Sequence, residues 1–361
     1  MELRLHYGSA PRWLFERMVS LARGILRVMV YEFGVKEVLV RLSDPLFFQA
    51  LSNVLGFDWD SSGSTTVTCG VLREALRKED LGIYVAGGKG EASRRTLDEV
   101  EIIGERFSLP TWKIDRLKYA SRMVAKVDSA AIQAGYQIYH HAMFVAENGE
   151  WTVIQQGLNI EEKTARRYHW LSENIKSFVE EPHSGIIGDK AHGRVLDLTA
   201  KNSEECRKTC VDLVADNPLK TVAPYISTVD ASQPSITRWL GGAEAQHYSI
   251  IPVKVNWEAL KRAYEFKPKN FEELLAMKGL GPATVRGLAL VAEIIYGAKV
   301  SWKDPIKFSF AFGGKDGVPY PVNRRAMERA AAYLKEALEA AEVGDREKLE
   351  ALKRLRKLLP Q

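Results

Sequence analysis

Residues 271–297 form the stretch that most constrains how this chain folds. An apolar run with helical spacing ends at Gly279-Leu280-Gly281, and a second helix is expected to begin at Pro282. The two glycines allow a tight turn and a close approach of another molecule to the backbone. The first N–H groups of the second helix have no partner within it and carry the positive end of its dipole. The stretch therefore predicts a helical hairpin whose turn suits a phosphate group.

This hairpin resembles the helix-hairpin-helix motif, with which many DNA repair enzymes hold a DNA backbone without reading its sequence. The resemblance implies the following DNA-binding residues: Lys278, Gly279, Gly281, Thr284 and Arg286. The alternatives are an ordinary helical hairpin and a hairpin used for protein contact. The motif performs no chemistry itself, so any catalytic centre must be sought elsewhere in the chain.

Composition places the chain among soluble globular proteins. It has 361 residues, of which 46% are hydrophobic and 27% charged, and its net charge is +5, which suits a polyanionic partner. Cys69, Cys206 and Cys210 form no C-x-x-C pair, so no zinc site is expected and a reducing compartment fits. The sequence has neither an apolar run long enough to span a membrane nor a signal-peptide core. We therefore expect a cytoplasmic protein.

The order of the elements predicts an α+β fold. Residues 1–220 are expected to form a mixed α+β catalytic domain with a small sheet, and 221–254 a linker or boundary region. Residues 255–361 are expected to form an all-α, DNA-binding domain that contains the hairpin. The expected helices are 11–33, 45–56, 67–80, 96–140 (clearest over 121–139), 164–173 and 203–215, followed by helices from 257 onward except at 312–323. The expected strands are 35–42, 81–86 and 194–200, together with a β-hairpin over 143–157 that turns at Asn148-Gly149.

The densest group of polar residues lies between positions 113 and 170. It contains Ser121, Arg122, Lys126, Asp128, Gln133, His140, His141, Gln155, Gln156, Arg166, Arg167 and His169. The histidine pair precedes the first strand of the β-hairpin and the glutamine pair ends the second, so the two pairs should be neighbours. Adjacent strand residues point to opposite faces, so at most one of His140 and His141 should enter a site.

This group suits hydrolysis of a phosphodiester bond. We expect a divalent metal ion, Mn²⁺ or Mg²⁺, to be held by Asp128, His140 and His141. The expected catalytic residues are Asp128, His140, His141, Gln155 and His169, with a histidine also able to act as a general base. The expected phosphate-binding residues are Arg122, Lys126, Arg166 and Arg167. The alternative is a buried hydrogen-bonded network that fixes the junction of a strand and a helix.

Two further segments are candidates for function. The glycine-rich stretch 87–95, with Lys89 and Arg94, follows a strand and suits backbone N–H contacts to a nucleic-acid phosphate, although it lacks the Walker spacing. The alternative is a surface loop. Asp304 lies 23 residues after Gly281, near the place where helix-hairpin-helix DNA glycosylases carry a catalytic aspartate. Ala283 stands where bifunctional members have lysine, so a glycosylase here would be monofunctional. Asp304 also precedes a proline, where aspartate commonly forms turns.

The chain as a whole resembles the domain of unknown function 763 family, which occurs mainly in archaea and some thermophilic bacteria. The resemblance rests on GSAPRWLFERM, GGKGEASR, the run from Ser121 through Asp128 to YHH, VIQQG, ARRYHWLSE, the hairpin and FGGKDGVPYPVNR, in that order. The family pattern has histidine at position 312 and aspartate at 323, where this chain has Phe312 and Asn323. Those two positions are therefore not essential to any chemistry shared with the family.

The leading hypothesis from the sequence is a metal-dependent nuclease that binds the DNA backbone, acting in DNA repair or processing. A monofunctional glycosylase that uses Asp304 and a non-enzymatic DNA-binding protein are the alternatives. No membrane partner is expected, and the sequence allows a homodimer.

Overall fold

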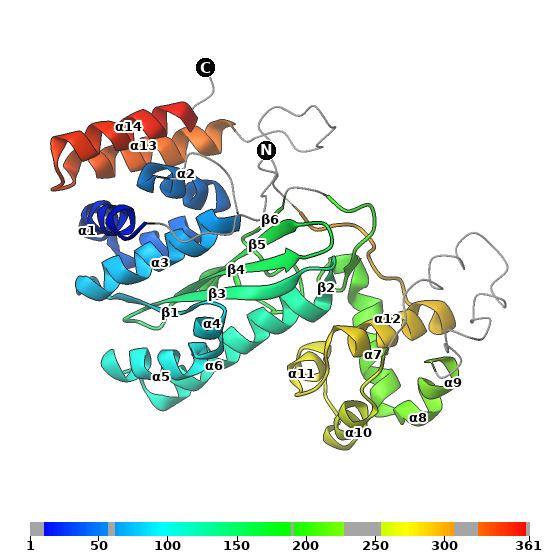
Figure 1. The fold of residues 1–361 in the computed structure, drawn as a ribbon. Helices are drawn as coiled ribbons and strands as arrows, with labels where there is room; N and C mark the ends of the chain where they lie inside the picture. The colour runs from blue at the N-terminus through cyan, green and yellow to red at the C-terminus, as the bar shows by residue number, and fades with distance from the viewer. Residues whose placement is uncertain (1–10, 57–61, 189–190, 227–253, 307–323, 359–361) are drawn as a thin grey trace.

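The structure is a computed structural model that describes residues 11–56, 62–188, 191–226, 254–306 and 324–358. Phe312 and Asn323 lie outside these residues. The described chain has the mixed α and β architecture that the sequence predicts, with helices on both faces of one antiparallel sheet (Figure 1). The strands, in spatial order, are β1 (Ile83–Lys89), β3 (Gln137–Ala146), β4 (Trp151–Asn159), β5 (Thr164–Leu171) and β6 (Gly185–Gly188). A second, small sheet pairs β2 (Ile132–Gln133) with β7 (Leu196–Asp197).

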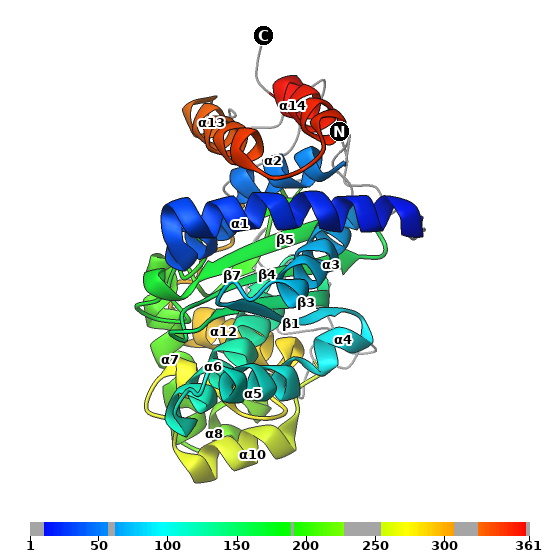
Figure 2. The same ribbon diagram turned by 90° about the vertical axis from the view of Figure 1, so that its left-hand side faces the viewer.

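One face of the sheet is covered by helices from both ends of the described chain. These are α1 (Arg12–Ser43), α2 (Pro45–Leu55), α3 (Ser62–Lys78), α13 (Arg324–Ala340) and α14 (Asp345–Leu358). Their apolar residues share one core with Val85, Phe144 and Ile154 of the sheet. Figure 2 shows α1 lying across the strands, with α13 and α14 as the outermost layer on this side.

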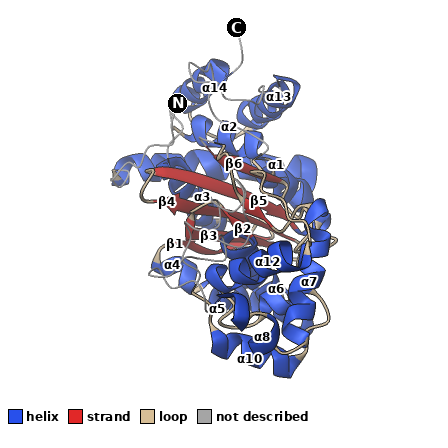
Figure 3. Cartoon of the chain, turned by 90° about the vertical axis from the view of Figure 1, so that its right-hand side faces the viewer, coloured by secondary structure: helices blue, strands red, loops and turns tan. Residues whose placement is uncertain are grey.

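The other face packs against α5 (Thr96–Arg106) and α6 (Thr111–Lys126), with the short α4 (Glu91–Arg94) beside β1. Beyond them lie α7 (Glu204–Ala215), α8 (Pro218–Thr221), α9 (Ala223–Ile226), α10 (Trp257–Phe266), α11 (Phe271–Ala276) and α12 (Pro282–Tyr296). Figure 3 shows α7 and α12 beside α6. Residues 255–306 and 324–358, which were expected to form one helical domain, therefore pack on opposite faces of the sheet.

The β-hairpin of β3 and β4 forms where the sequence predicts it. Gly149 adopts a φ of 82°, and its N–H donates to Ala146 at 2.8 Å, which closes the turn. The register places His140 opposite Gln156 and His141 opposite Gln155. The histidine and glutamine pairs are therefore cross-strand neighbours at the end of the sheet away from the turn.

One expected strand and the end of one expected helix are wrong. Residues 35–42, expected as a strand, continue α1 beyond a kink at Gly34, whose φ is 81° and ψ is 163°. Val38, Leu39 and Leu42 are the buried positions, and their spacing is helical although the segment is rich in valine. The expected helix 121–139 ends in η1 (Val127–Ala131), and β3 already begins at residue 137.

The expected helix 164–173 is also wrong, because residues 164–171 form β5. This strand is covered on both faces, so all its residues except the first are buried and it has no polar face to set a period of two. Arg166 and Arg167 resemble the solvent side of a helix in the sequence. In the fold both are buried on opposite faces of the sheet.

The first residue of the glycine-rich stretch 87–95, Gly87, has a role in packing. Gly87 lies inside β1 with a φ of 85°, its N–H donates to Glu99 at 2.7 Å, and its carbonyl accepts from Arg73 at 2.5 Å. A Cβ atom at this position would meet the carbonyl oxygen of His141 and would lie 2.5 Å from the Thr96 hydroxyl. Gly87 is therefore required for the close packing of β1 against β3 and α5.

We expect Gly87→Ala to lower the free energy of unfolding by about 1–3 kcal/mol more than Gly90→Ala. Both glycines have positive φ values, but nothing lies within 4 Å of a Cβ at Gly90, so the difference isolates the clash. Urea unfolding of both variants measures it. Equal losses would contradict the close packing described for Gly87.

Candidate active site

A chain of four hydrogen-bonded side chains lies between α6 and the sheet. The Ser121 hydroxyl lies 3.0 Å from His141 Nε2, and His141 Nδ1 lies 2.5 Å from Gln155 Oε1. The Gln155 amide donates to Asp128 Oδ2 at 2.5 Å. All four side chains are buried. Three of the predicted catalytic residues, Asp128, His141 and Gln155, thus belong to one continuous polar network.

Donors from three segments converge on the Asp128 carboxylate. Besides Gln155 on β4, Trp170 Nε1 on β5 donates to Oδ2 at 3.0 Å, and His183 Nε2 lies 2.5 Å from Oδ1. Asp128 is fully buried, where a carboxylate without partners would be strongly destabilising. It projects from η1, a π-helical turn, and such turns are frequent at functional sites. Asp128 therefore fixes the position and orientation of His183.

His183 joins this buried network to a cavity of about 580 Å³. Its Nε2 faces Asp128, and its Nδ1 has no hydrogen bond to any residue that the structure describes. The lining of the cavity also includes Asp197, Thr199, Ser301, Lys303 and Asp304. An imidazole that lines a cavity, with one nitrogen fixed by a carboxylate and the other without a described partner, suits a general base.

Asp197 is a second buried carboxylate of the cavity, at the end of β7. Its Oδ1 accepts hydrogen bonds from the Thr199 N–H at 2.8 Å and from the Thr199 hydroxyl at 2.6 Å. Burial raises the pKa of Asp197 above its ordinary value, while the Thr199 bonds and the nearby His183 oppose that rise. Asp197 and His183 are therefore electrostatically coupled within one cavity.

Asp304, the alternative catalytic residue, also lines this cavity, but three donors engage its carboxylate. Arg166 Nη2 and the His192 N–H donate to Oδ2 at 2.7 and 2.8 Å, and the Ile306 N–H donates to Oδ1 at 3.2 Å. The Arg166 and Asp304 side chains are only 0% and 4% exposed. Arg166, which was expected to clamp phosphate, is thus held inside the protein away from a nucleic-acid backbone. Asp304 anchors that buried guanidinium.

Four other members of the polar group lie on the opposite face of the sheet, against α1 to α3. They are His140, Gln156, Arg167 and His169. Arg167 donates to Thr65 at 3.2 Å and to Gln49 at 3.3 Å, and its guanidinium stacks over Phe48. His169 Nδ1 lies 3.2 Å from the Leu42 carbonyl. These side chains therefore do not share a site with Asp128.

The expected metal site of Asp128, His140 and His141 is not assembled. His140 and His141 alternate across the sheet, so His140 points away from the face that carries Asp128. Among the residues with described positions, no group of three or more His, Cys, Asp or Glu side chains is placed to hold a metal ion.

The expected DNA-binding residues of the 271–297 segment divide into two sets. Lys278 and Gly279 are exposed in the turn between α11 and α12, and Gly281 is partly exposed. Thr284 is buried, and its hydroxyl accepts the Asn256 N–H at 2.9 Å. Arg286 is half-buried, and burial lowers its pKa. Only the turn itself offers groups to a partner, and Thr284 belongs to the packing beneath it.

The other expected phosphate contacts also divide by exposure. Lys126 is half-buried, burial lowers its pKa, and its ammonium donates to Leu280 at 2.7 Å and Met277 at 3.0 Å. It therefore supports the turn from within. Lys89, Arg94 and Arg122 are exposed. They remain available to a polyanion.

With the geometry in place, the comparisons with known proteins give one match. A family model described as a protein of unknown function (DUF763) matches residues 1–322. The chain belongs to this family. No curated protein matches it, and no solved structure does. The family match confirms the resemblance read from the sequence and includes every residue named above in the network and the cavity. No described helix has the length and apolar character needed to cross a membrane.

His183 and Asp197 are the members of the site that sequence reasoning missed. His183 lies 55 positions from Asp128 in a loop segment, EEPHSG, and no local spacing links the two. Asp197 sits in the predicted strand 194–200 and resembles an exposed strand residue. Their proximity depends on how β5, β6 and β7 are arranged, which no pattern within one segment predicts.

The buried histidines predict a pH dependence of stability. Burial lowers the pKa of His140 to about 3, whereas an unfolded chain has a histidine pKa of about 6.5. Between these values only the unfolded chain binds the proton, so the free energy of unfolding falls as the pH is lowered, by up to about 1.4 kcal/mol per pH unit for this residue. We expect His140→Leu to make the dependence shallower by up to that amount, measured by urea unfolding.

The control for this measurement is Phe144→Leu, a change on the same face of β3. It should lower stability equally at every pH, because it removes packing and no titrating group. A slope in His140→Leu that equals the wild-type slope would show that His140 does not stay neutral in the fold.

Proposed function

We propose that this protein is a nucleic-acid phosphodiesterase, in which the turn before α12 holds the backbone and His183 activates a water. The observation that carries the proposal is the His183–Asp128 pair facing a cavity, 2.5 Å apart, because this pairing gives a positioned base. The nuclease hypothesis from the sequence supplies the substrate class, a nucleic acid. The catalytic assignment moves from His140 and His169 to His183.

The arrangement of the turn supports binding of a phosphate. The carbonyl groups of residues 277–280 accept hydrogen bonds from Lys126, Asn256 and Arg262. The Pro282 carbonyl accepts from Gln133 at 2.8 Å. No side chain caps the start of α12. Because the carbonyl dipoles are bound by the protein, the turn presents exposed backbone and the positive end of the helix to an anion.

Two of the side chains that bind the turn also place it close to His183. Lys126 and Gln133, which bind the turn, stand on either side of η1, and Asp128 projects from η1. A strand held by the turn would therefore run beside the segment that orients His183. One rigid connection then serves both binding and catalysis.

The chemistry proposed for His183 is a proton transfer at Nδ1. Nδ1 accepts a proton from water in the cavity as the water oxygen attacks the phosphorus, and Asp128 stabilises the resulting imidazolium through Nε2. The P–O bond to the leaving nucleotide oxygen breaks, and that oxygen takes a proton from solvent water. Asp197 adds a buried carboxylate to the lining, whereas the Asp304 carboxylate is paired with Arg166. Because Asp197 would repel a phosphate, we propose that cleavage requires Mg²⁺ or Mn²⁺, which commonly bind through one or two carboxylates and the substrate phosphate.

The first test separates binding from folding with Gly281→Asp. Gly281 is the N-cap of α12, its φ is −92°, and nothing lies within 4 Å of an added Cβ. Aspartate there should cap the helix, leaving stability unchanged or raised by about 1 kcal/mol. It should also repel phosphate and weaken duplex DNA binding about tenfold or more, measured by anisotropy at fixed salt.

Gly193→Asp is the matched control, because it adds the same charge at an exposed position with open space. Its DNA affinity should stay close to wild type. If Gly281→Asp binds duplex DNA as tightly as Gly193→Asp, the turn does not hold the backbone.

The second test addresses catalysis with Asp128→Asn. The asparagine oxygen keeps the bonds from Gln155 and Trp170, and its NH₂ donates to His183 Nε2. The proton of His183 then resides on Nδ1, which can no longer act as a base. We expect cleavage of end-labelled DNA to fall at least about 100-fold with DNA affinity unchanged. His183→Gln should give the same loss.

These reactions are run with Mg²⁺, with Mn²⁺ and with chelator, and the products are compared before and after alkali. Fragments that appear only after alkali, and that are lost in Asp304→Asn, would replace the phosphodiesterase by a glycosylase. Retarded DNA with no product under any condition would leave a binding protein without catalysis.

A further inference from the structure

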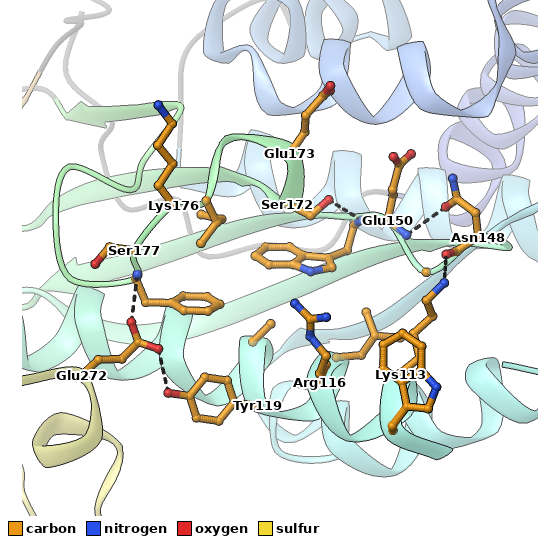
Figure 4. A pocket seen from close by; sticks show the side chains of 17 residues that line it. Lys113, Arg116, Tyr119, Asn148, Glu150, Ser172, Glu173, Lys176, Ser177 and Glu272 are labelled. Atoms are coloured by element: carbon orange, nitrogen blue, oxygen red, sulfur yellow. Dashed lines mark hydrogen bonds between the residues drawn. The ribbon is translucent and has the colours of Figure 1, made fainter. Parts of the chain in front are cut away.

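A second cavity, of about 620 Å³, lies between the first half of α6, the β3–β4 turn and residues 172–178 (Figure 4). None of the catalytic or binding residues predicted from the sequence lines it. Its aromatic lining residues are Trp112, Tyr119, Trp151 and Phe178. The rings of Trp151 and Phe178 are parallel within 5°, with centroids 6.4 Å apart, and Trp112 is 56% exposed. Flat apolar surfaces of this kind suit a flat ligand.

The cavity lining carries the cations Lys113, Arg116 and Lys176 and the carboxylates Glu150, Glu173 and Glu272, of which the Glu150 Oε2 is buried without a hydrogen bond to a described residue. Glu272 accepts from the Tyr119 hydroxyl at 2.9 Å and from the Phe178 N–H at 3.3 Å, and Glu173 binds Lys36 at 2.7 Å. Arg116 and Lys176, in contrast, are exposed and have no ion pair with any described residue. Figure 4 shows the Arg116 side chain rising from α6 toward the strands and residues 172–178.

An anion with a flat aromatic part is the ligand that meets both properties. The Arg116 guanidinium lies 5.9 Å from the Trp112 ring centroid, so a ring placed on Trp112 would bring an attached phosphate close to a free cation. A nucleotide base with its phosphate would place the base on the exposed Trp112 ring and the phosphate beside the exposed Arg116 guanidinium.

The position of the cavity links it to the proposed path of the nucleic acid. Glu272, which bonds to Tyr119 and Phe178, lies in the first turn of α11, so the cavity adjoins the helix that leads to the backbone-binding turn. Residues 172–178 lead on to His183, and α6 leads from Arg116 to Asp128. The rise of a helix places Arg116 and Asp128 about 18 Å apart along the helix axis. This distance is the length of a few nucleotides.

We propose that this aromatic cavity binds the base of an unpaired nucleotide, so that the substrate is single-stranded or carries a base turned out of its duplex. The inference rests on the proposed function, because it assumes a nucleic acid held by the turn before α12. Stacking on an exposed aromatic residue contributes about 1–3 kcal/mol per base and is tolerant of sequence. The cavity therefore selects strand structure without selecting sequence.

The test measures how loss of the Trp112 ring or the Arg116 guanidinium changes the binding of single strands and of duplexes. Trp112→Ala and Arg116→Ala are compared with wild type by anisotropy on short fluorescein-labelled single strands and on blunt duplexes. Both variants should bind the single strand about 5- to 150-fold more weakly, with duplex affinity unchanged. Trp13→Ala is the control, since Trp13 is 60% exposed on α1, which covers the opposite face of the sheet.

A series of single strands with one abasic position identifies the partner of the ring. At one position, loss of the base should weaken wild-type binding by the same factor as Trp112→Ala and should cost the variant nothing more. Additive losses at every position would overturn the inference, as would equal affinity of wild type and Trp112→Ala.

The Gly281→Asp variant distinguishes failure of the base-binding inference from failure of the proposed function. If Gly281→Asp weakens duplex binding while Trp112→Ala changes nothing, the backbone clamp stands and the base site falls. If Gly281→Asp has no effect but Trp112 couples to one base, the base site stands and the clamp falls.

Discussion

The buried carboxylate of Asp128 is the interaction on which the arrangement of the site depends. It receives hydrogen bonds from β4, from β5 and from His183 in the segment before β6, so one side chain from α6's π-helical extension joins three parts of the chain. A fully buried carboxylate is stable only when its acceptor capacity is used. The requirement to satisfy it therefore also fixes where His183 lies, and with it the wall of the cavity.

The sheet divides the polar residues of the chain into two groups that do not meet. His140 and His141 are neighbours in sequence, yet one packs toward α1 to α3 and the other toward α6. Burial lowers the pKa of both, so both are neutral in the folded protein near neutral pH. The two faces thus differ in role: one leads to an open cavity through His183, and the other closes the packing of the N-terminal helices around Arg167.

Local chemistry made some elements predictable from sequence. The β3–β4 turn at Asn148-Gly149, the cap of α2 at Asp44 and the start of α12 at Pro282 each depend on a few adjacent residues. The strand β5 was missed for a different reason. β5 is buried on both faces, so its arginines find partners inside the fold and its pattern gives no period.

Long-range contacts explain why some residues of the site could not be predicted from the sequence. His183 and Asp128 meet only because β5 and β6 return the chain to η1, and the aromatic cavity combines α6, a turn and a loop from three separate segments. The predicted polar group was correct for the cross-strand neighbours Gln155 and His141, since a hairpin register follows from its turn. His140 and Asp128 do not meet, because adjacent residues of β3 point to opposite faces of the sheet.

The packing of α13 and α14 on α1 and α2 bears on how the chain is made. Tyr333 of α13 meets Phe33 and Phe47 with ring centroids 4.4 and 5.6 Å away, and Leu334 and Leu338 are fully buried against the same helices. During synthesis, α1 and α2 leave the ribosome about 300 residues before their cover. Their apolar surface must stay exposed, or shielded by a chaperone, through translation of the whole sheet. The core shared by α1, α2, α13 and α14 is thus completed only after the sheet has been translated.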